Sequence, residues 1–199
     1  MWLKNLMFGF LLVAVGGCTS TSNDDDSSSV DSSSPETELI IDWDDCGGQM
    51  GEHACDFTFK DQNDVDWSLY DHHGTVMVLD FSAVWCGYCR VAAAEVQALQ
   101  DQLDPTGTEF LWVTILVDDA QGNPPDLSIV QEWADAYGIT SSPVLQGDRS
   151  IIDTSGENGY PITSWPMFII VNEDLIIESG LRGWSKELLF DMITEALAE

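Results

Sequence analysis

The sequence predicts an α/β protein in which a central mixed β-sheet has helices on both faces, giving three layers. Two observations lead to this class. Continuous apolar runs typical of buried strands alternate along the chain with segments whose apolar residues recur at helical spacing. Near the C-terminus, two further apolar runs flank Asn172-Glu173-Asp174, a pattern typical of a β-hairpin.

Two long strands and two helices are expected before that hairpin. Residues 75–81 form a continuous, partly β-branched apolar run, and residues 109–117 form a second one. Apolar positions at helical spacing predict a helix over residues 89–103, directly after the first strand. A second helix is expected over residues 125–137, because it starts at a proline and is followed by Gly138.

The remaining elements are shorter. Val144 and Leu145 predict a brief strand, which a loop rich in Gly and Ser separates from the hairpin. The hairpin strands are expected at residues 167–171 and 175–178. Residues 188–197 close the chain as an amphipathic helix.

Size and charge limit the function. With 199 residues and 44% hydrophobic composition, the chain can bury one substantial core, so one folded domain is expected. Thirty-five acidic residues against six basic ones give a formal charge of -29. Since like charges repel, nucleic acid and anionic lipid surfaces are excluded as partners.

The N-terminus predicts export. Lys4 precedes an apolar run over residues 6–15 that is too short to span a bilayer, which needs about 20 residues, so residues 1–17 read as a signal peptide. Val15-Gly16-Gly17-Cys18 resembles the bacterial lipobox, in which the cysteine becomes the lipidated mature N-terminus. An uncleaved anchor or a chance cysteine is the alternative.

A tether and one domain follow. Residues 18–42 carry the lipidated Cys18 and then mostly Ser, Thr and Asp, a composition that cannot offset the entropy of ordering, so a disordered acidic tether is expected. Residues 43–199 form the folded domain.

Four cysteines remain once Cys18 is assigned to lipid. Cys86 and Cys89 have the two-residue gap of a redox dithiol at a helix start. Cys46 and Cys55 are candidates for a structural disulfide in an oxidising compartment. A zinc or copper site that adds His53 and the pair His72-His73, and unpaired thiols, are the alternatives. A solvated turn is the simpler interpretation of the histidine pair.

The segment Val78-Leu79-Asp80-Phe81-Ser82-Ala83-Val84-Trp85-Cys86-Gly87-Tyr88-Cys89 resembles the active-site strand and loop of thioredoxins. The order of elements, the helical insert after the second strand and the lipoprotein start are similar to the exported TlpA/ResA-like branch of that superfamily, which is related to AhpC/TSA proteins. The resemblance covers residues 51–199 and implies a thioredoxin-like fold.

The resemblance implies individual catalytic roles. Cys86 is the nucleophile, because the helix N-terminus stabilises its thiolate. Cys89 is the less exposed resolving thiol. Asp80 matches a buried acid whose raised pKa lets it accept the proton of the resolving cysteine, although a simple strand-end residue is the alternative.

A substrate-binding surface is also implied. Pro166 matches a cis-proline that faces the dithiol, where the preceding residue, here Trp165, offers backbone hydrogen bonds to an extended substrate. Trp85, Gly87 and Tyr88 complete the expected surface around the cysteines. Two departures are noted. Trp165 is bulky for its position, and Gly87-Tyr88 matches neither the Gly-Pro of reductants nor the Pro-His of strong oxidants.

These features predict a thiol-disulfide oxidoreductase that is tethered to a bacterial cell envelope, faces the periplasm, and reduces cysteine-containing exported proteins. A membrane or periplasmic thiol partner would regenerate it. No metal and no cofactor are expected, and the protein is expected to be a monomer. A peroxidase is one alternative, although Ala83 stands where peroxiredoxins have threonine. A copper-delivery module is another, although its usual Cys-x-x-x-Cys is not matched.

Overall fold

The computed structural model describes Trp43 and residues 45–198, which belong to a compact unit formed by Asp42–Glu199. The predicted signal peptide, Cys18 and the predicted tether lie outside the described residues. Within the described part of the chain, no helix is both long enough and apolar enough to cross a membrane.

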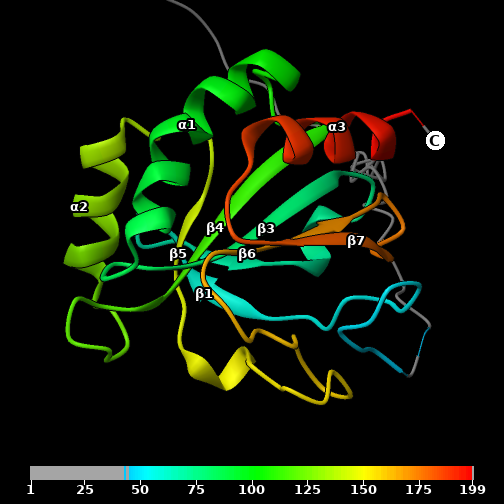
Figure 1. The fold of residues 1–199 in the computed structure, drawn as a ribbon, viewed down its shortest axis with the longest axis horizontal. Coiled ribbons are helices and arrows are strands. Elements are labelled where there is room, and N and C mark those ends of the chain that lie inside the picture. The colour runs from blue at the N-terminus through cyan, green and yellow to red at the C-terminus, as the bar shows by residue number, and fades with distance from the viewer. Residues whose placement is uncertain (1–42, 44, 199) are drawn as a thin grey trace, which may run out of the picture. The chain divides into compact units, whose positions relative to one another are not determined.

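A five-stranded mixed sheet forms the centre of the fold, in the order β5-β4-β3-β6-β7 (Figure 1). β3 (Val76–Ala83) pairs in parallel with β4 (Phe110–Asp118), which pairs in parallel with β5 (Val144–Gln146). On the other side of β3, β6 (Met167–Val171) and β7 (Ile177–Arg182) run antiparallel. Every residue of β3 and β4 is buried, as expected for strands covered on both faces.

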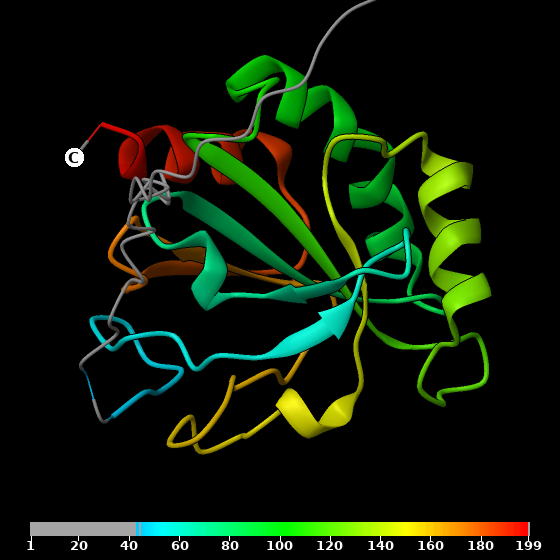
Figure 2. The same ribbon diagram turned by 180° about the vertical axis from the view of Figure 1, so that it is seen from behind.

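The three α-helices of the described residues lie on one face of this sheet (Figures 1 and 2), whereas the sequence led us to expect helices on both. α1 (Gly87–Leu103), α2 (Leu127–Tyr137) and α3 (Lys186–Ala196) contribute to one hydrophobic cluster with Trp112 and Phe168 of the sheet. The reason is handedness. The chain steps from β3 to β4 to β5 in one direction, and two right-handed crossovers in the same direction place both helices on the same side.

The opposite face is covered by a small hairpin, two 3₁₀ helices and loops. The sequence predicted the Gly- and Ser-rich loop before β6, but neither the small hairpin nor the two short helices. The hairpin joins β1 (Thr58–Lys60) and β2 (Asp66–Ser68), and the short helices are η1 (Tyr70–His72) and η2 (Arg149–Ile151). Tyr160, in the loop after η2, packs against Phe81 of β3 at 5.0 Å between ring centroids and donates its hydroxyl to the Cys55 carbonyl at 2.7 Å. The third layer is therefore largely non-helical.

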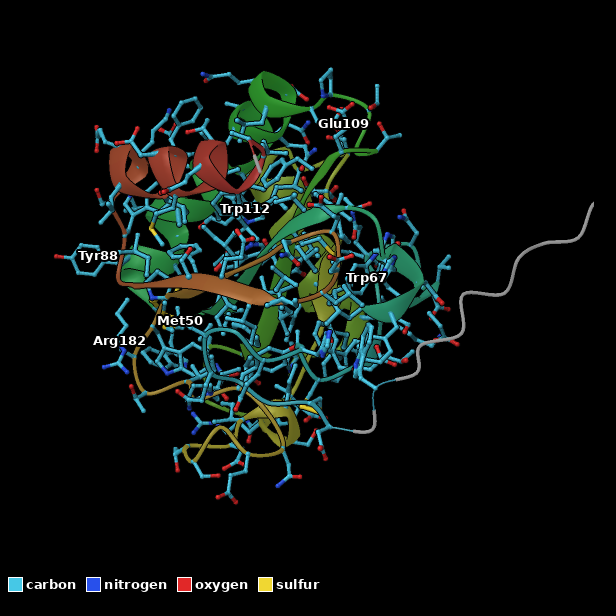
Figure 3. The ribbon with its side chains drawn as sticks, turned by 90° about the vertical axis from the view of Figure 1, so that its right-hand side faces the viewer. Met50, Trp67, Tyr88, Glu109, Trp112 and Arg182 are labelled. Carbon is cyan, nitrogen blue, oxygen red and sulfur yellow. A yellow bond between two sulfur atoms is a disulfide. The ribbon has the colours of Figure 1, made fainter. Side chains whose placement is uncertain are left out.

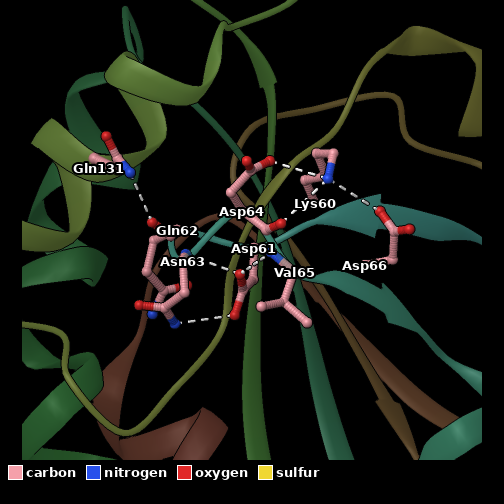
Figure 4. A network of polar contacts seen from close by, with 8 residues as sticks. All are labelled: Lys60, Asp61, Gln62, Asn63, Asp64, Val65, Asp66 and Gln131. Carbon is pink, nitrogen blue, oxygen red and sulfur yellow. Dashed lines mark hydrogen bonds and ion pairs between the residues drawn. The ribbon is translucent and has the colours of Figure 1, made fainter.

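The turn of this hairpin attaches it to the rest of the fold (Figure 4). The Asp61 carboxylate accepts the backbone N–H groups of Asn63 and Val65, which fixes the turn. The side-chain oxygen of Gln62 accepts the backbone N–H of Val144 at 2.8 Å. The backbone carbonyl of Gln62 accepts a hydrogen bond from the Gln131 side chain of α2. The hairpin thereby covers the β5 edge of the central sheet.

Helix and strand boundaries differ from the predictions where side chains cap an element. Asp126 and Ser185 accept backbone N–H groups at the starts of α2 and α3, so these helices begin at Leu127 and Lys186. β7 begins at Ile177, two residues later than predicted. The preceding Leu175 adopts a left-handed conformation, with φ of 62°, and belongs to the hairpin turn.

Candidate active site

The dithiol lies where the central strand β3 meets α1. β3 ends at Ala83, and three residues later Cys86 takes the N-cap position of α1, with extended backbone. Its Sγ atom accepts the backbone N–H of Cys89 at 3.1 Å, in the way that a cap oxygen would. The sequence predicted this helix from residue 89, whereas Gly87 and Tyr88 form its first turn.

Cys86 and Cys89 are joined in a disulfide, with their Cα atoms 5.2 Å apart. The two sulfur-bearing residues differ in access to solvent, since Cys86 is 5% exposed and Cys89 is fully buried. Both residues are therefore buried, and Cys86 is the less shielded of the two.

Asp80 is a fully buried carboxyl group in β3, on the sheet face that the helices cover. The Ser82 hydroxyl donates to one of its oxygens at 2.6 Å, and the Trp112 indole N–H and Thr114 hydroxyl lie 3.4 Å from the other. Burial raises the pKa of Asp80 to about 6, against the three hydrogen bonds, which lower it. This carboxyl group therefore changes protonation state near neutral pH.

Trp85, immediately before the dithiol, is fixed by a buried carboxylate. Its indole N–H donates to Asp118 at 3.1 Å, and Asp118 ends β4 with its side chain 1% exposed. Arg149 of η2 forms two hydrogen bonds to the same carboxylate, at 2.8 and 2.5 Å. These bonds, led by those from Arg149, hold the pKa of Asp118 below its usual range. A charged pair thus anchors the indole ring.

The Trp165–Pro166 peptide bond is cis and lies directly before β6. The Trp165 ring meets the Trp85 ring edge to face, with centroids 6.4 Å apart, which brings the two loops together beside Cys86. The Pro166 carbonyl accepts the N–H of Gly183 at 2.9 Å, so the start of the β7–α3 connection also borders the site.

The surface around Cys86 is aromatic and exposed. Trp85 is 44% exposed and Tyr88 is 67% exposed, and Figure 3 shows the Tyr88 side chain projecting outward from α1. Gly87 lies between them, and a side chain at its position would meet no atom within 4 Å. The five residues predicted as a substrate-binding surface therefore lie in adjacent loops and in the first turn of α1.

A second disulfide joins Cys46 and Cys55, whose Cα atoms are 4.8 Å apart. His53 stacks on Trp43 at 3.9 Å between ring centroids, and His72 stacks on Trp67 at 4.5 Å. His72 is therefore partly buried by this contact, and burial lowers its pKa. Within residues 45–198 and Trp43, no group of three or more His, Cys, Asp or Glu side chains is arranged to hold a metal ion.

Residues 50–179 match the sequence model of the AhpC/TSA family, which is well over half of the chain. The chain belongs to the AhpC/TSA family. The matched segment of this family member contains the dithiol, Asp80 and the cis-proline, whereas Cys46 lies outside it.

Named relatives identify the branch of the family. The chain is 29% identical to the thioredoxin-like protein YneN of Bacillus subtilis over 133 residues, which cover 66% of this chain and 71% of YneN. It is 26% identical to the thiol-disulfide oxidoreductase ResA of Halalkalibacterium halodurans over 149 residues, which cover 75% of this chain and 77% of ResA.

The fold agrees with these relatives. A putative thiol:disulfide interchange protein DsbE from Chlorobium tepidum superposes with a TM-score of 0.59 at 21% identity, covering 75% of this chain and 99% of that structure. The fold is therefore thioredoxin-like. Together with the dithiol at the start of α1, these relatives make this AhpC/TSA-family protein a thiol-disulfide oxidoreductase.

Sequence reasoning missed two residues of this family member's site. Asp118 directly follows the strand predicted over residues 109–117, and Arg149 lies in the predicted loop rich in Gly and Ser. They are 31 residues apart, and only the fold brings them together. The sequence did hold one indication of Arg149. Arginine is rare in so acidic a chain, so each one is a candidate for an ion pair with a buried carboxylate.

We predict that Asp80 makes the stability of this enzyme depend on pH. Because burial raises its pKa from 3.8 in the unfolded chain to about 6, its contribution to stability is complete below about pH 4 and falls as pH rises through 6. The free energy of unfolding should lose about 3 kcal/mol from this group by pH 7. Asp80→Asn should remove that slope in denaturant titrations of the oxidised protein.

Exposed Asp101 provides a matched control for Asp80. It lies in the last turn of α1, and among the described residues its carboxylate accepts a hydrogen bond from the side chain of Gln97. Asp101→Asn leaves Asp80 in place, so the loss of stability that Asp80 causes as pH rises should persist in this variant. If Asp80→Asn retains the wild-type slope, the buried carboxyl does not titrate in this range.

Proposed function

We propose that this thiol-disulfide oxidoreductase reduces disulfides in exported proteins while a lipid anchor on Cys18 holds it to a bacterial cell envelope. The observation that carries the chemistry is the placement of Cys86 at the N-cap of α1, with its sulfur on the N–H of Cys89. The N-terminal sequence, with its apolar run and Val15-Gly16-Gly17-Cys18, supports the location.

The exchange proceeds in two steps once a thiol partner has reduced the Cys86–Cys89 bond. The Cys86 thiolate attacks one sulfur of a substrate disulfide, forms a mixed disulfide, and releases the other substrate sulfur as a thiolate. Cys89 then attacks Cys86, which re-forms the internal bond and releases the second substrate thiol. The substrate disulfide gains two electrons, and the enzyme dithiol loses them.

The helix start favours ionisation of Cys86. The unpaired N–H groups of the first turn and the positive end of the helix dipole stabilise a thiolate more than a thiol. This effect lowers the pKa of a cysteine at such a position below its ordinary value of about 8.5. Since Cys89 is buried, the attack on a bulky protein substrate falls to Cys86.

Asp80 is the group that we assign to proton transfer. Cys89 must lose its proton before it can resolve the mixed disulfide, and it is buried in the same hydrophobic cluster that covers this face of β3. A carboxyl group with a pKa of about 6 can accept a proton near neutral pH and return it later. An ordinary aspartate on the surface would be a weaker base.

The cis-proline loop supports binding of an extended substrate next to Cys86. Trp165 and Trp85 meet edge to face, and Tyr88 extends the aromatic surface at the start of α1. Ala83 supplies no hydroxyl group three residues before Cys86, where the peroxiredoxin pattern has threonine. Disulfide exchange is therefore favoured over peroxide reduction. The direction, reduction rather than oxidation, rests on the similarity to TlpA/ResA-like proteins.

Trapping tests the division of labour between the two cysteines. Cys89→Ser should accumulate mixed disulfides on Cys86 with envelope proteins, because the resolving thiol is gone. Cys86→Ser should trap none, and both variants should lose multiple-turnover reduction of insulin. The covalent adducts are separated on non-reducing gels and identified by mass spectrometry.

The second disulfide provides the control for trapping. The double variant Cys46→Ser/Cys55→Ser should still reduce insulin, because it leaves the dithiol intact. If Cys89→Ser captures no protein and the wild type leaves insulin disulfides intact, the proposed function is wrong.

The lipid anchor has a separate test. Cys18→Ala should abolish labelling by a radioactive fatty acid, because the acylated thiol is gone. Cys46→Ser should keep the label, because that cysteine belongs to the folded domain. Labelling that persists in Cys18→Ala would contradict the lipid anchor.

A further inference from the structure

Positive charge is rare in this chain and is gathered near the dithiol. The whole sequence has six Lys and Arg residues against 35 acidic ones. Five of the six are in the described part of the chain. One of these five, Lys60, is on β1. The other four are on elements that border the active site: Arg90, Arg149, Arg182 and Lys186.

Two of the four cations near the site are neutralised. Arg149 is bonded to Asp118, which anchors Trp85. Lys186, the first residue of α3, pairs with Glu95 of α1 at 2.5 Å. These ion pairs connect neighbouring elements, and because each cation is neutralised they add little net charge to the surface.

The other two, Arg90 and Arg182, are exposed and form no ion pair with any described residue. Arg90 lies one helical turn after Cys86, and its backbone N–H donates to the backbone carbonyl of Cys86 at 3.3 Å. Arg182 ends β7 as the cross-strand partner of Met167, which follows the cis-proline. Figure 3 shows Arg182 and Tyr88 projecting at the same edge of the molecule.

Exposed apolar side chains accompany these two arginines. Trp85, Tyr88 and Val91 are 44%, 67% and 52% exposed, and all three belong to the loop or first turns that carry the dithiol. Arg182 and Tyr88 thus share one edge of the molecule beside the dithiol, and Arg90 lies in the first turn of α1, where its charge acts on the Tyr137 hydroxyl of α2. Guanidinium groups bind carboxylates through paired hydrogen bonds.

We propose that this face selects substrate segments in which acidic residues flank the reactive cystine, with Arg90 and Arg182 as specificity-determining residues. The inference rests on the proposed function and names its substrate class. The partner is an extended, acidic, cysteine-bearing protein segment, which charge complementarity favours at this face. The rest of this acidic chain, whose formal net charge is -29 with the two arginines included, would repel such a segment.

Salt screens the repulsion between an acidic substrate and the distant charges of the chain more strongly than it screens the attraction of the substrate to the two arginines. At about 0.15 M ionic strength the Debye length is about 8 Å, so charges on distant faces are largely screened. Charges in direct contact with the substrate are screened much less. The field of the whole chain favours basic substrates, whereas the two arginines favour acidic ones, and the two effects therefore predict opposite orders of reactivity.

The test compares three synthetic peptides that share one intramolecular disulfide and differ only in flanking Asp, Asn or Lys residues. The reduced full-length protein is mixed with each peptide at about 0.15 M salt, and the second-order rate constant of peptide reduction is measured. Wild type should reduce the Asp peptide about fivefold faster than the Asn peptide, as expected for two exposed charge contacts, and the Lys peptide slowest.

The double variant Arg90→Gln/Arg182→Gln should bring the Asp-to-Asn rate ratio to one or below. Lys60→Gln is the matched control, because Lys60 lies on β1 and is already paired with Asp64 and Asp66 (Figure 4). It should leave the wild-type ratio unchanged.

Three results would overturn the inference. The first is a wild-type preference for the Lys peptide, and the second is an Asp-to-Asn ratio that survives in the double variant. The third is an acidic preference that appears only after Asp24, Asp25 and Asp26 are replaced by Asn, which would assign the arginines to the chain's own acidic segment. If wild type reduces none of the peptides, the proposed function itself fails.

Discussion

The interaction on which the site depends is the contact between the Cys86 sulfur and the first turn of α1. β3 is buried along its whole length, so the sheet fixes where the chain leaves the core and where the helix begins. Cys86 then caps that helix through the N–H of Cys89. The same backbone groups that a cap oxygen would satisfy become available to a thiolate, which couples helix formation to sulfur chemistry.

Near this contact, the buried carboxyl group of Asp80 lowers the stability of the fold when it is ionised. A carboxyl group inside a fully buried strand is destabilising when ionised, and its raised pKa expresses that cost. Ser82, Trp112 and Thr114 offset part of it through hydrogen bonds. A buried carboxyl group with a raised pKa fits the proton-transfer role that we propose for Asp80.

Local patterns in the sequence predicted the long strands, the three helices and the dithiol, and the resemblance to thioredoxins implied that Pro166 is a cis-proline. They did not predict β1 and β2, because three-residue strands made of Thr58–Lys60 and Asp66–Ser68 carry no periodic signal. The placement of α1 and α2 on one face follows from strand order and crossover handedness, which single elements do not reveal. The Arg149–Asp118–Trp85 contacts join distant segments and become visible only in the fold.

The account stands on an easily ionised Cys86, and its titration tests that claim most directly. The reduced full-length protein, with Cys46–Cys55 intact, is alkylated with iodoacetamide across pH, and modification of Cys86 is followed by mass spectrometry. The account predicts an inflection well below 8.5, the ordinary pKa of a cysteine. An inflection at or above 8.5 would contradict it, because the helix start would then give the sulfur no advantage as a nucleophile.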